Sequence, residues 1–378
     1  MSQNAAITKE KVFFPNLDGL RFFSFFSVYL FHVYLLLFDK YRPSGAGYGI
    51  TKFLFQNGEV GVNFFFVLSG FLITYLLIEE KKFTGQIHVG KFYIRRVLRI
   101  WPLFYLCLAF GLLIYPVIKK MTGGELFHVA NPWTYFFFLN NFDFMVHGAP
   151  AIISVLWSVA IEEQFYLVWP VILFLTPFKK YKYVFFIIIL ASLVFRMIHH
   201  DNERVLQFHT LAVVGDMALG GLLAYYSIFN AGFRRRIVEM PRAGIFVIYG
   251  LAIVILLFRK AIFPGYLMVF ERLFIGIIFG LIILEQNFSD RSLFKMKNYR
   301  RISKMGTYTY GLYCLHVIAM TFTEQGLVKI GWDVKKTTTC VLIGCAGFVL
   351  SVLIALASYY FFERKFLKLK DKFAFITR

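Results

Sequence analysis

The feature that most constrains this chain is a series of apolar segments, each long enough to cross a lipid bilayer. A spanning helix needs about 20 mostly apolar residues. Ten segments qualify, roughly at residues 17–38, 60–79, 97–118, 154–176, 183–198, 209–229, 243–258, 265–286, 306–325 and 338–362. Because 59% of the 378 residues are hydrophobic and only 16% are charged, a soluble fold could not bury the apolar surface. The sequence therefore predicts an all-α, polytopic transmembrane helix bundle of about ten spans.

Two loop regions leave alternatives open. The aromatic run 133–144 would add an eleventh span if it crossed the bilayer instead of lying along the interface. The longer stretch 119–153 could form a lid over the outer mouth, and the sequence does not decide this. The four cysteines lie in apolar segments without metal-type spacing, so we expect neither a metal site nor a structural role beyond packing.

The distribution of basic residues predicts the orientation. With the N-terminus inside, the cytoplasmic pieces carry 26 of the 41 Lys and Arg residues, and the outer loops carry 11. This excess is typical of polytopic membrane proteins, so both termini are predicted to be cytoplasmic. The net charge of +20 is then mostly topogenic, and nucleic-acid binding is not expected. We expect a cytoplasmic segment 1–16, a transmembrane domain 17–362 and a basic cytoplasmic tail 363–378.

Ionisable residues inside spans are functional candidates, because each costs roughly 2.5–3.5 kcal/mol to insert. Arg21 and His32 in the first span are eleven residues apart, so they share a helix face and lie roughly 16 Å apart along the axis. Taken singly, Arg21 could reach the lipid head groups and His32 could be a hydrogen-bonded packing residue. Together they suit an elongated anionic ligand whose reactive end reaches inward. We expect both to line one tunnel.

Three arginines open the third span. In KFYIRRVLRIWPLFY, Arg95, Arg96 and Arg99 begin a helix, where neighbouring guanidiniums and a helix N-terminus could hold phosphate. A positive-inside anchor is the alternative. The position of Arg99, past the edge of the apolar segment, favours a ligand site.

The fourth span carries polar groups on one face. Ser158, Glu162 and Tyr166 follow an i, i+4, i+8 spacing. Glu162 and Glu163 both need a partner, a proton or water, and they point about 100° apart. We favour Glu162 as the residue that faces a site, with a structural Arg–Glu pair as the alternative.

Two other spans contribute polar residues. Tyr310, Tyr313 and His316 recur every three residues in the ninth span and form a polar strip. In the second span, Ser69 and Gly70 form either a packing notch, which we favour, or a close approach to a ligand. Ser69 has no neighbouring base in the sequence, so the chain does not resemble a serine hydrolase.

In their order along the chain, six motifs resemble those of the acyltransferase-3 family, bacterial membrane enzymes that mostly acetylate cell-surface sugars. The motifs are LDGLRFFSFFSVYLFH, GVNFFFVLSGFLIT, FYIRRVLRIWPLFY, LWSVAIEEQFYLVWPV, YTYGLYCLH and YYFFERKF. The resemblance implies a multi-pass O-acyltransferase of the bacterial cytoplasmic (inner) membrane. Its donor would be cytosolic acetyl-CoA or another short acyl-CoA, and no metal would be needed. Its acceptor would be a hydroxyl of lipopolysaccharide O-antigen, an exopolysaccharide or a lipid-linked saccharide.

The resemblance also implies roles for the candidate residues. His32 would be the general base or a nucleophile, Glu162 would orient it, and His316 would be a further catalytic residue. The donor would be bound by a separate group of residues: Arg21, Arg96, Arg99, Ser69 and Tyr313. Some relatives continue into an extracytoplasmic domain, whereas this chain ends at Arg378, so we expect such a step to need a separate protein.

Two classes of alternative stay open. Buried His, Glu and Arg side chains would also suit a proton-coupled transporter or flippase, although the two halves of the chain show no inverted repeat. The same chemistry could instead act on a lipid or a macrocyclic small molecule.

Overall fold

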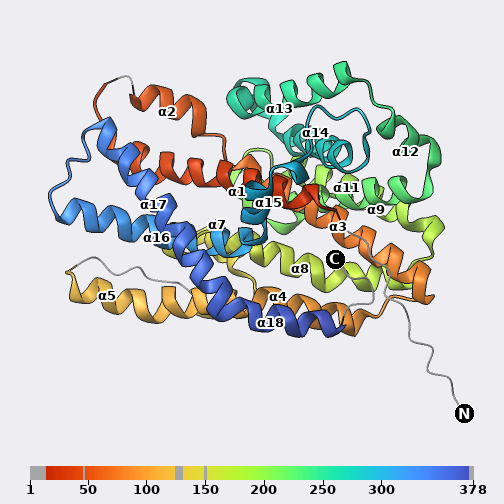
Figure 1. The fold of residues 1–378 in the computed structure, drawn as a ribbon, viewed down its shortest axis with the longest axis horizontal. Helices are drawn as coiled ribbons and strands as arrows, with labels where there is room; N and C mark the ends of the chain where they lie inside the picture. Colours follow the sequence, from red (N-terminus) through yellow and green to blue (C-terminus); the bar gives the residue numbers. More distant parts are fainter. Residues whose placement is uncertain (1–13, 46, 124–130, 149–150, 374–378) are drawn as a thin grey trace, which may run out of the picture.

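The chain folds into a helical bundle, seen in a computed structural model that describes residues 14–45, 47–123, 131–148 and 151–373 (Figure 1). The α-helices are α1 (Asn16–Val33), α2 (Gly47–Phe55), α3 (Val60–Thr84), α4 (Val89–Ala109), α5 (Tyr115–Met121), α6 (Pro132–Phe136), α7 (Asn140–His147), α8 (Leu156–Leu175), α9 (Tyr181–Ile198), α10 (Glu203–Phe208), α11 (Thr210–Phe229), α12 (Ala231–Val238), α13 (Arg242–Ile262), α14 (Met268–Phe288), α15 (Arg300–Thr307), α16 (Thr309–Lys329), α17 (Thr337–Ser358) and α18 (Arg364–Lys370). Wider π-helical turns continue three of them: Tyr34–Asp39 after α1, Phe110–Ile114 after α4 and Tyr359–Glu363 after α17.

Within the described residues, nine helical stretches are long and apolar enough to cross a membrane. They correspond to nine of the ten predicted segments, which confirms a polytopic helical bundle. The remaining segment, 306–325, forms the 21-residue helix α16, but its Thr, Tyr, His, Glu and Gln side chains keep it below the apolarity of the other nine.

The loop 119–153 contains two short α-helices and the 3₁₀ helix Ala151–Ile153 in its described part. The aromatic run forms α6 and α7, which have 5 and 8 residues and are too short to span a bilayer. Residues 124–130 and 149–150 lie outside the described part, as do most of the predicted N-terminal segment and the last residues of the tail, 374–378. The lid interpretation therefore falls partly on residues that are not described.

Helices α3 and α11 cross at the centre of the bundle with their backbones in contact. A Cβ atom on Gly70 of α3 would lie 1.9 Å from the carbonyl oxygen of Met217, and one on Gly220 of α11 would lie 2.0 Å from that of Val67. No side chain fits at these distances, so both positions require glycine. The packing role favoured for Gly70 is confirmed.

The helix ends that carry the basic excess lie together at one end of the bundle. Hydrogen bonds join them in pairs: Asn16 to Gln286, Lys81 to Thr176, Arg95 to Phe373 and Asp290 to Val238. The connections that carry the excess of Lys and Arg therefore lie at the same end of the bundle. That this end faces the cytoplasm stays a prediction.

Helices α1 and α16 run parallel and side by side, and they carry His32 and His316. At the basic end, Gly306 packs against the backbone of Asp18. Midway, His316 contacts His32 at 3.2 Å. At the other end, Lys40 pairs with Glu324 at 2.6 Å.

Candidate active site

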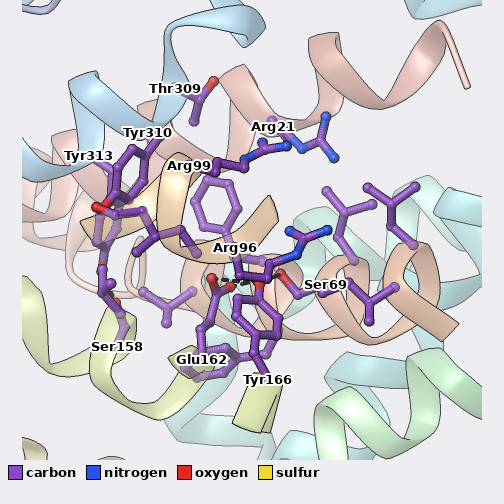
Figure 2. A pocket seen from close by; sticks show the side chains of 18 of the residues that line it. Arg21, Ser69, Arg96, Arg99, Ser158, Glu162, Tyr166, Thr309, Tyr310 and Tyr313 are labelled. Carbon is purple, nitrogen blue, oxygen red and sulfur yellow. Dashed lines mark hydrogen bonds between the residues drawn. The ribbon is translucent and has the colours of Figure 1, made fainter. Parts of the chain in front are cut away.

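A cavity of about 130 Å³ lies where α1, α3, α4, α8 and the α15–α16 junction meet. Its polar lining residues are Thr307 and the ten labelled in Figure 2: Arg21, Ser69, Arg96, Arg99, Ser158, Glu162, Tyr166, Thr309, Tyr310 and Tyr313. The structure therefore brings together all five residues predicted to bind the donor, and Glu162 with them.

Three guanidiniums converge on this cavity from two helices (Figure 2). Arg21 of α1 is held by Asp18 through an Nη1–Oδ1 contact of 2.6 Å. Arg96 and Arg99 are three residues apart on α4, so they point to the same side. Arg95, by contrast, donates to Glu80 at 3.0 Å and to the Phe373 carbonyl, which takes it out of the cavity.

Arg96 is held by aromatic faces. Its guanidinium carbon lies 5.3 Å from the ring centre of Phe92 and 5.2 Å from that of Tyr166, distances at which cation–π attraction acts. Among the described residues it forms no hydrogen bond or ion pair, and its Nε is buried without a partner. Its donors are thus available to an anionic ligand.

Glu162 anchors a hydrogen-bonded group beside Arg96 (Figure 2). Ser69 donates to its Oε1 at 2.8 Å, and Tyr166 donates to its Oε2 at 3.0 Å. Ser69 therefore does have a carboxylate neighbour, supplied by α8, which is not visible in the sequence around it. Glu163 points elsewhere and accepts from the indole of Trp101 at 2.8 Å, so Glu162 lines the cavity and Glu163 does not.

Tyr313 closes the far end of the cavity. Its hydroxyl is 2.6 Å from that of Ser158, and its ring centre is 5.9 Å from that of Phe65. Behind it lies His316, with ring centres 6.0 Å apart. Thr309, on the same helix, has a buried hydroxyl without a hydrogen-bond partner among the described residues, a further polar group at the cavity wall.

The two histidines form a separate pair beyond Tyr313. His32 and His316 contact each other, but neither is part of the cavity lining. The expected common tunnel for Arg21 and His32 is therefore not found: Arg21 lines the cavity and His32 does not. The expected contact between Glu162 and His32 is not found either, because Glu162 is turned toward Ser69 and Tyr166 of α3 and α8.

A buried ion pair that sequence reasoning missed lies outside this cavity. Arg272 of α14 donates to Asp216 of α11 at 2.5 Å, and Asn63 of α3 is 3.4 Å from the same carboxylate. Asp216 could have been noticed, because it is the only acidic residue in the apolar segment 209–229. No metal-binding arrangement of three or more His, Cys, Asp or Glu side chains occurs in the described part of the chain.

Fold and cavity together define a multi-pass membrane protein with a cationic pocket and acid–base groups inside its bundle. Comparison with known proteins gives the family. Residues 14–360 match the model of the acyltransferase-3 family, described as an acyltransferase domain. The chain belongs to this family, as its motifs indicated.

Similar proteins include several O-acetyltransferases. The chain is 29% identical over 334 residues to the peptidoglycan O-acetyltransferase OatA of Listeria monocytogenes, covering 83% of this chain and 50% of the relative. It is 29% identical over 396 residues to O-acetyltransferase OatA of Staphylococcus aureus, covering 97% and 59%. For the putative peptidoglycan O-acetyltransferase YrhL of Bacillus subtilis, the identity is 26%, covering 94% and 55%. The chain thus spans between half and three-fifths of these relatives. No solved structure matches it significantly.

Proposed function

We propose that this protein transfers an acetyl or other short acyl group from cytosolic acyl-CoA to a hydroxyl of a cell-surface glycan, in the bacterial cytoplasmic membrane. The observation that carries the proposal is the convergence of Arg21, Arg96 and Arg99 on one cavity that also holds the carboxylate of Glu162. In an acyltransferase, such a cavity suits a donor with several negative charges and a thin thioester arm.

The arginines would bind the phosphates of coenzyme A. A guanidinium presents a planar fork of donors that matches phosphate oxygens. Arg96 suits this role best, because Phe92 and Tyr166 hold it in place while its own donors stay unused. Ser69 and Tyr313 would contact the arm deeper in the cavity, where their hydroxyls lie along the wall.

The thioester would then have to pass Tyr313. His32 lies eleven residues beyond Arg21 on α1, roughly 16 Å along the helix axis. Tyr313 and His316 stand between the cavity and His32. We propose that the ring of Tyr313 turns aside when the arm enters, so that the thioester passes beside His316 and reaches the imidazole of His32.

His32 would act as the general base. The acceptor hydroxyl gives its proton to the imidazole as its oxygen attacks the thioester carbonyl carbon, and the departing thiolate takes the proton up. In the alternative scheme the imidazole attacks first, carries the acyl group and passes it to the acceptor. Glu162 would support the reaction from the cavity side, where it fixes the hydroxyls of Ser69 and Tyr166 beside Arg96.

The acceptor is proposed to be a glycan or its lipid-linked precursor at the outer face. Because relatives are named as peptidoglycan O-acetyltransferases, peptidoglycan is a candidate acceptor beside lipopolysaccharide, exopolysaccharide and glycolipids. A separate extracytoplasmic protein would be the partner in any relay onward from the membrane.

The test uses purified protein in liposomes with radiolabelled acetyl-CoA and a panel of these acceptors. We expect His32→Ala to lower transfer by about 10²–10⁴-fold, the contribution typical of a general base, with CoA binding and the thermal unfolding midpoint unchanged. His200→Ala is the matched control, because His200 lies away from the cavity and stacks on Tyr266. Near-normal transfer by His32→Ala would refute the catalytic assignment. A wild-type protein that neither transfers acetyl nor releases CoA would favour a transporter or flippase.

A further inference from the structure

The pair formed by His32 and His316 has hydrogen-bond partners that determine where the protons are. His316 is completely buried, and its ring packs edge-on against Phe25 with centres 5.5 Å apart. His32 is partly buried and contacts His316 of α16. Each ring also faces carbonyl oxygens of its own helix, and these fix the tautomers.

His316 must carry a proton on Nδ1. That nitrogen lies 2.8 Å from the carbonyl oxygen of Tyr313 and 3.2 Å from that of Leu312. A carbonyl oxygen only accepts hydrogen bonds. The neutral ring therefore has its lone pair on Nε2, the atom that faces His32.

The same reasoning fixes His32. Its Nδ1 lies 2.9 Å from the carbonyl oxygen of Val28 and 3.2 Å from Nε2 of His316. Both neighbours are acceptors, so Nδ1 of His32 carries the proton and donates to the two of them. The lone pair of His32 is then on Nε2, which forms no hydrogen bond within the part of the chain that the structure describes.

We infer that His316 is a positioning residue that, together with the Val28 carbonyl, orients His32 as its Nδ1–H tautomer, which makes Nε2 of His32 the basic atom of the reaction. This inference rests on the proposed acyl transfer. The acceptor O–H proton moves to Nε2 as the new C–O bond forms. The C–S bond then breaks, and the thiolate takes the proton from Nε2.

Between these two steps His32 is an imidazolium, and its partners stabilise it. Its Nδ1–H points at the lone pair of His316 and at the Val28 carbonyl, both of which attract the positive ring. In hydrolases with a Ser-His-Asp triad, a carboxylate stabilises the imidazolium. Here a neutral imidazole takes its place, which avoids a second ionised group in the membrane interior.

Two variants separate positioning from packing. His316→Leu keeps a similar volume but removes the acceptor, whereas His316→Gln offers an amide oxygen to Nδ1 of His32. We expect His316→Leu to lower kcat about 10- to 100-fold with KM for acetyl-CoA within about twofold of wild type, since the Val28 contact remains. His316→Gln should recover much of the loss. His200→Leu is the control and should leave kcat unchanged.

Nitrogen NMR of protein with ¹⁵N-labelled histidine in bilayers gives a readout that does not depend on catalysis. The His32 signals are assigned by their loss in His32→Gln. We expect a protonated Nδ1 and an unprotonated Nε2 for His32 in the wild type, and a smaller share of the Nδ1–H tautomer in His316→Leu, where the Val28 carbonyl is the remaining acceptor. A protonated Nε2 in the resting wild type overturns the inference. So does a kcat for His316→Leu equal to that of wild type, or equal losses in the Leu and Gln variants. If the tautomer is as expected but the wild type transfers no acetyl group, the proposed function fails instead.

Discussion

Replacing Arg96 by methionine gives the sharpest test of the cavity as a donor site. Methionine keeps an unbranched stem between the rings of Phe92 and Tyr166 but removes the charge and the hydrogen-bond donors. Arg96 forms no hydrogen bond or ion pair among the described residues, and the nearby carboxylate of Glu162 keeps its hydrogen bonds to Ser69 and Tyr166 when the charge of Arg96 is removed. The change should therefore act on the ligand and not on the fold.

The magnitude follows from the bonds that would be lost. A hydrogen bond to a charged group contributes about 1.5–3 kcal/mol, and about 1.4 kcal/mol corresponds to a tenfold change in affinity. Arg96→Met should thus raise the Kd for coenzyme A by about 10- to 150-fold. Arg96→Lys keeps a charge without the planar fork of donors, so its Kd for coenzyme A should lie between those of Arg96→Met and wild type.

Isothermal titration of CoA into detergent-solubilised protein measures this directly. Arg236→Met is the matched control, because Arg236 is exposed on α12 at the same end of the bundle and loses the same charge. Equal effects in the two variants would mean that net charge, and not the cavity, attracts the donor. An unchanged Kd in Arg96→Met, with a normal thermal unfolding midpoint, would refute the reasoning and leave Arg96 as a topological anchor.

Two further predictions concern the bundle itself. Gly70→Ala should prevent a stable fold, because its Cβ would lie 1.9 Å from the Met217 carbonyl oxygen. The control Gly90→Ala in α4 meets nothing within 4 Å and should be neutral or stabilising by up to about 1 kcal/mol. Thermal unfolding midpoints compare the two variants, and an unchanged midpoint in Gly70→Ala would contradict the packing. Asp216→Ala should destabilise the protein by about 3–5 kcal/mol, because it leaves Arg272 buried without its carboxylate. The double variant Asp216→Ala, Arg272→Met should recover part of that loss. Equal stabilities of wild type and Asp216→Ala would contradict a structural role for the ion pair.

The sequence predicted the helices and the faces of those helices well. The thickness of the bilayer sets the length of the spans. Spacing within one helix places Arg96 and Arg99 on one face, and Ser158 and Glu162 on one face, without any tertiary information. For this reason the cavity lining contains residues that had been chosen from single-helix patterns.

Contacts between helices could not be predicted in the same way. The rotation of α8 against α3 decides that Glu162 meets Ser69, and the alignment of α1 with α16 decides that His32 meets His316. These contacts are 93 and 284 residues apart in the chain, so no local pattern contains them. The expectation that Glu162 supports His32 failed for this reason.

The composition of α16 has a consequence for how the protein is made. This helix carries Tyr313 and His316, yet it is the long helix of the bundle that falls outside the nine most apolar stretches in the described structure. Such a helix partitions poorly into lipid alone and enters together with neighbours that cover its polar strip. We therefore expect the cavity and the histidine pair to form only after the ribosome has synthesised α16 and the helices that pack around it.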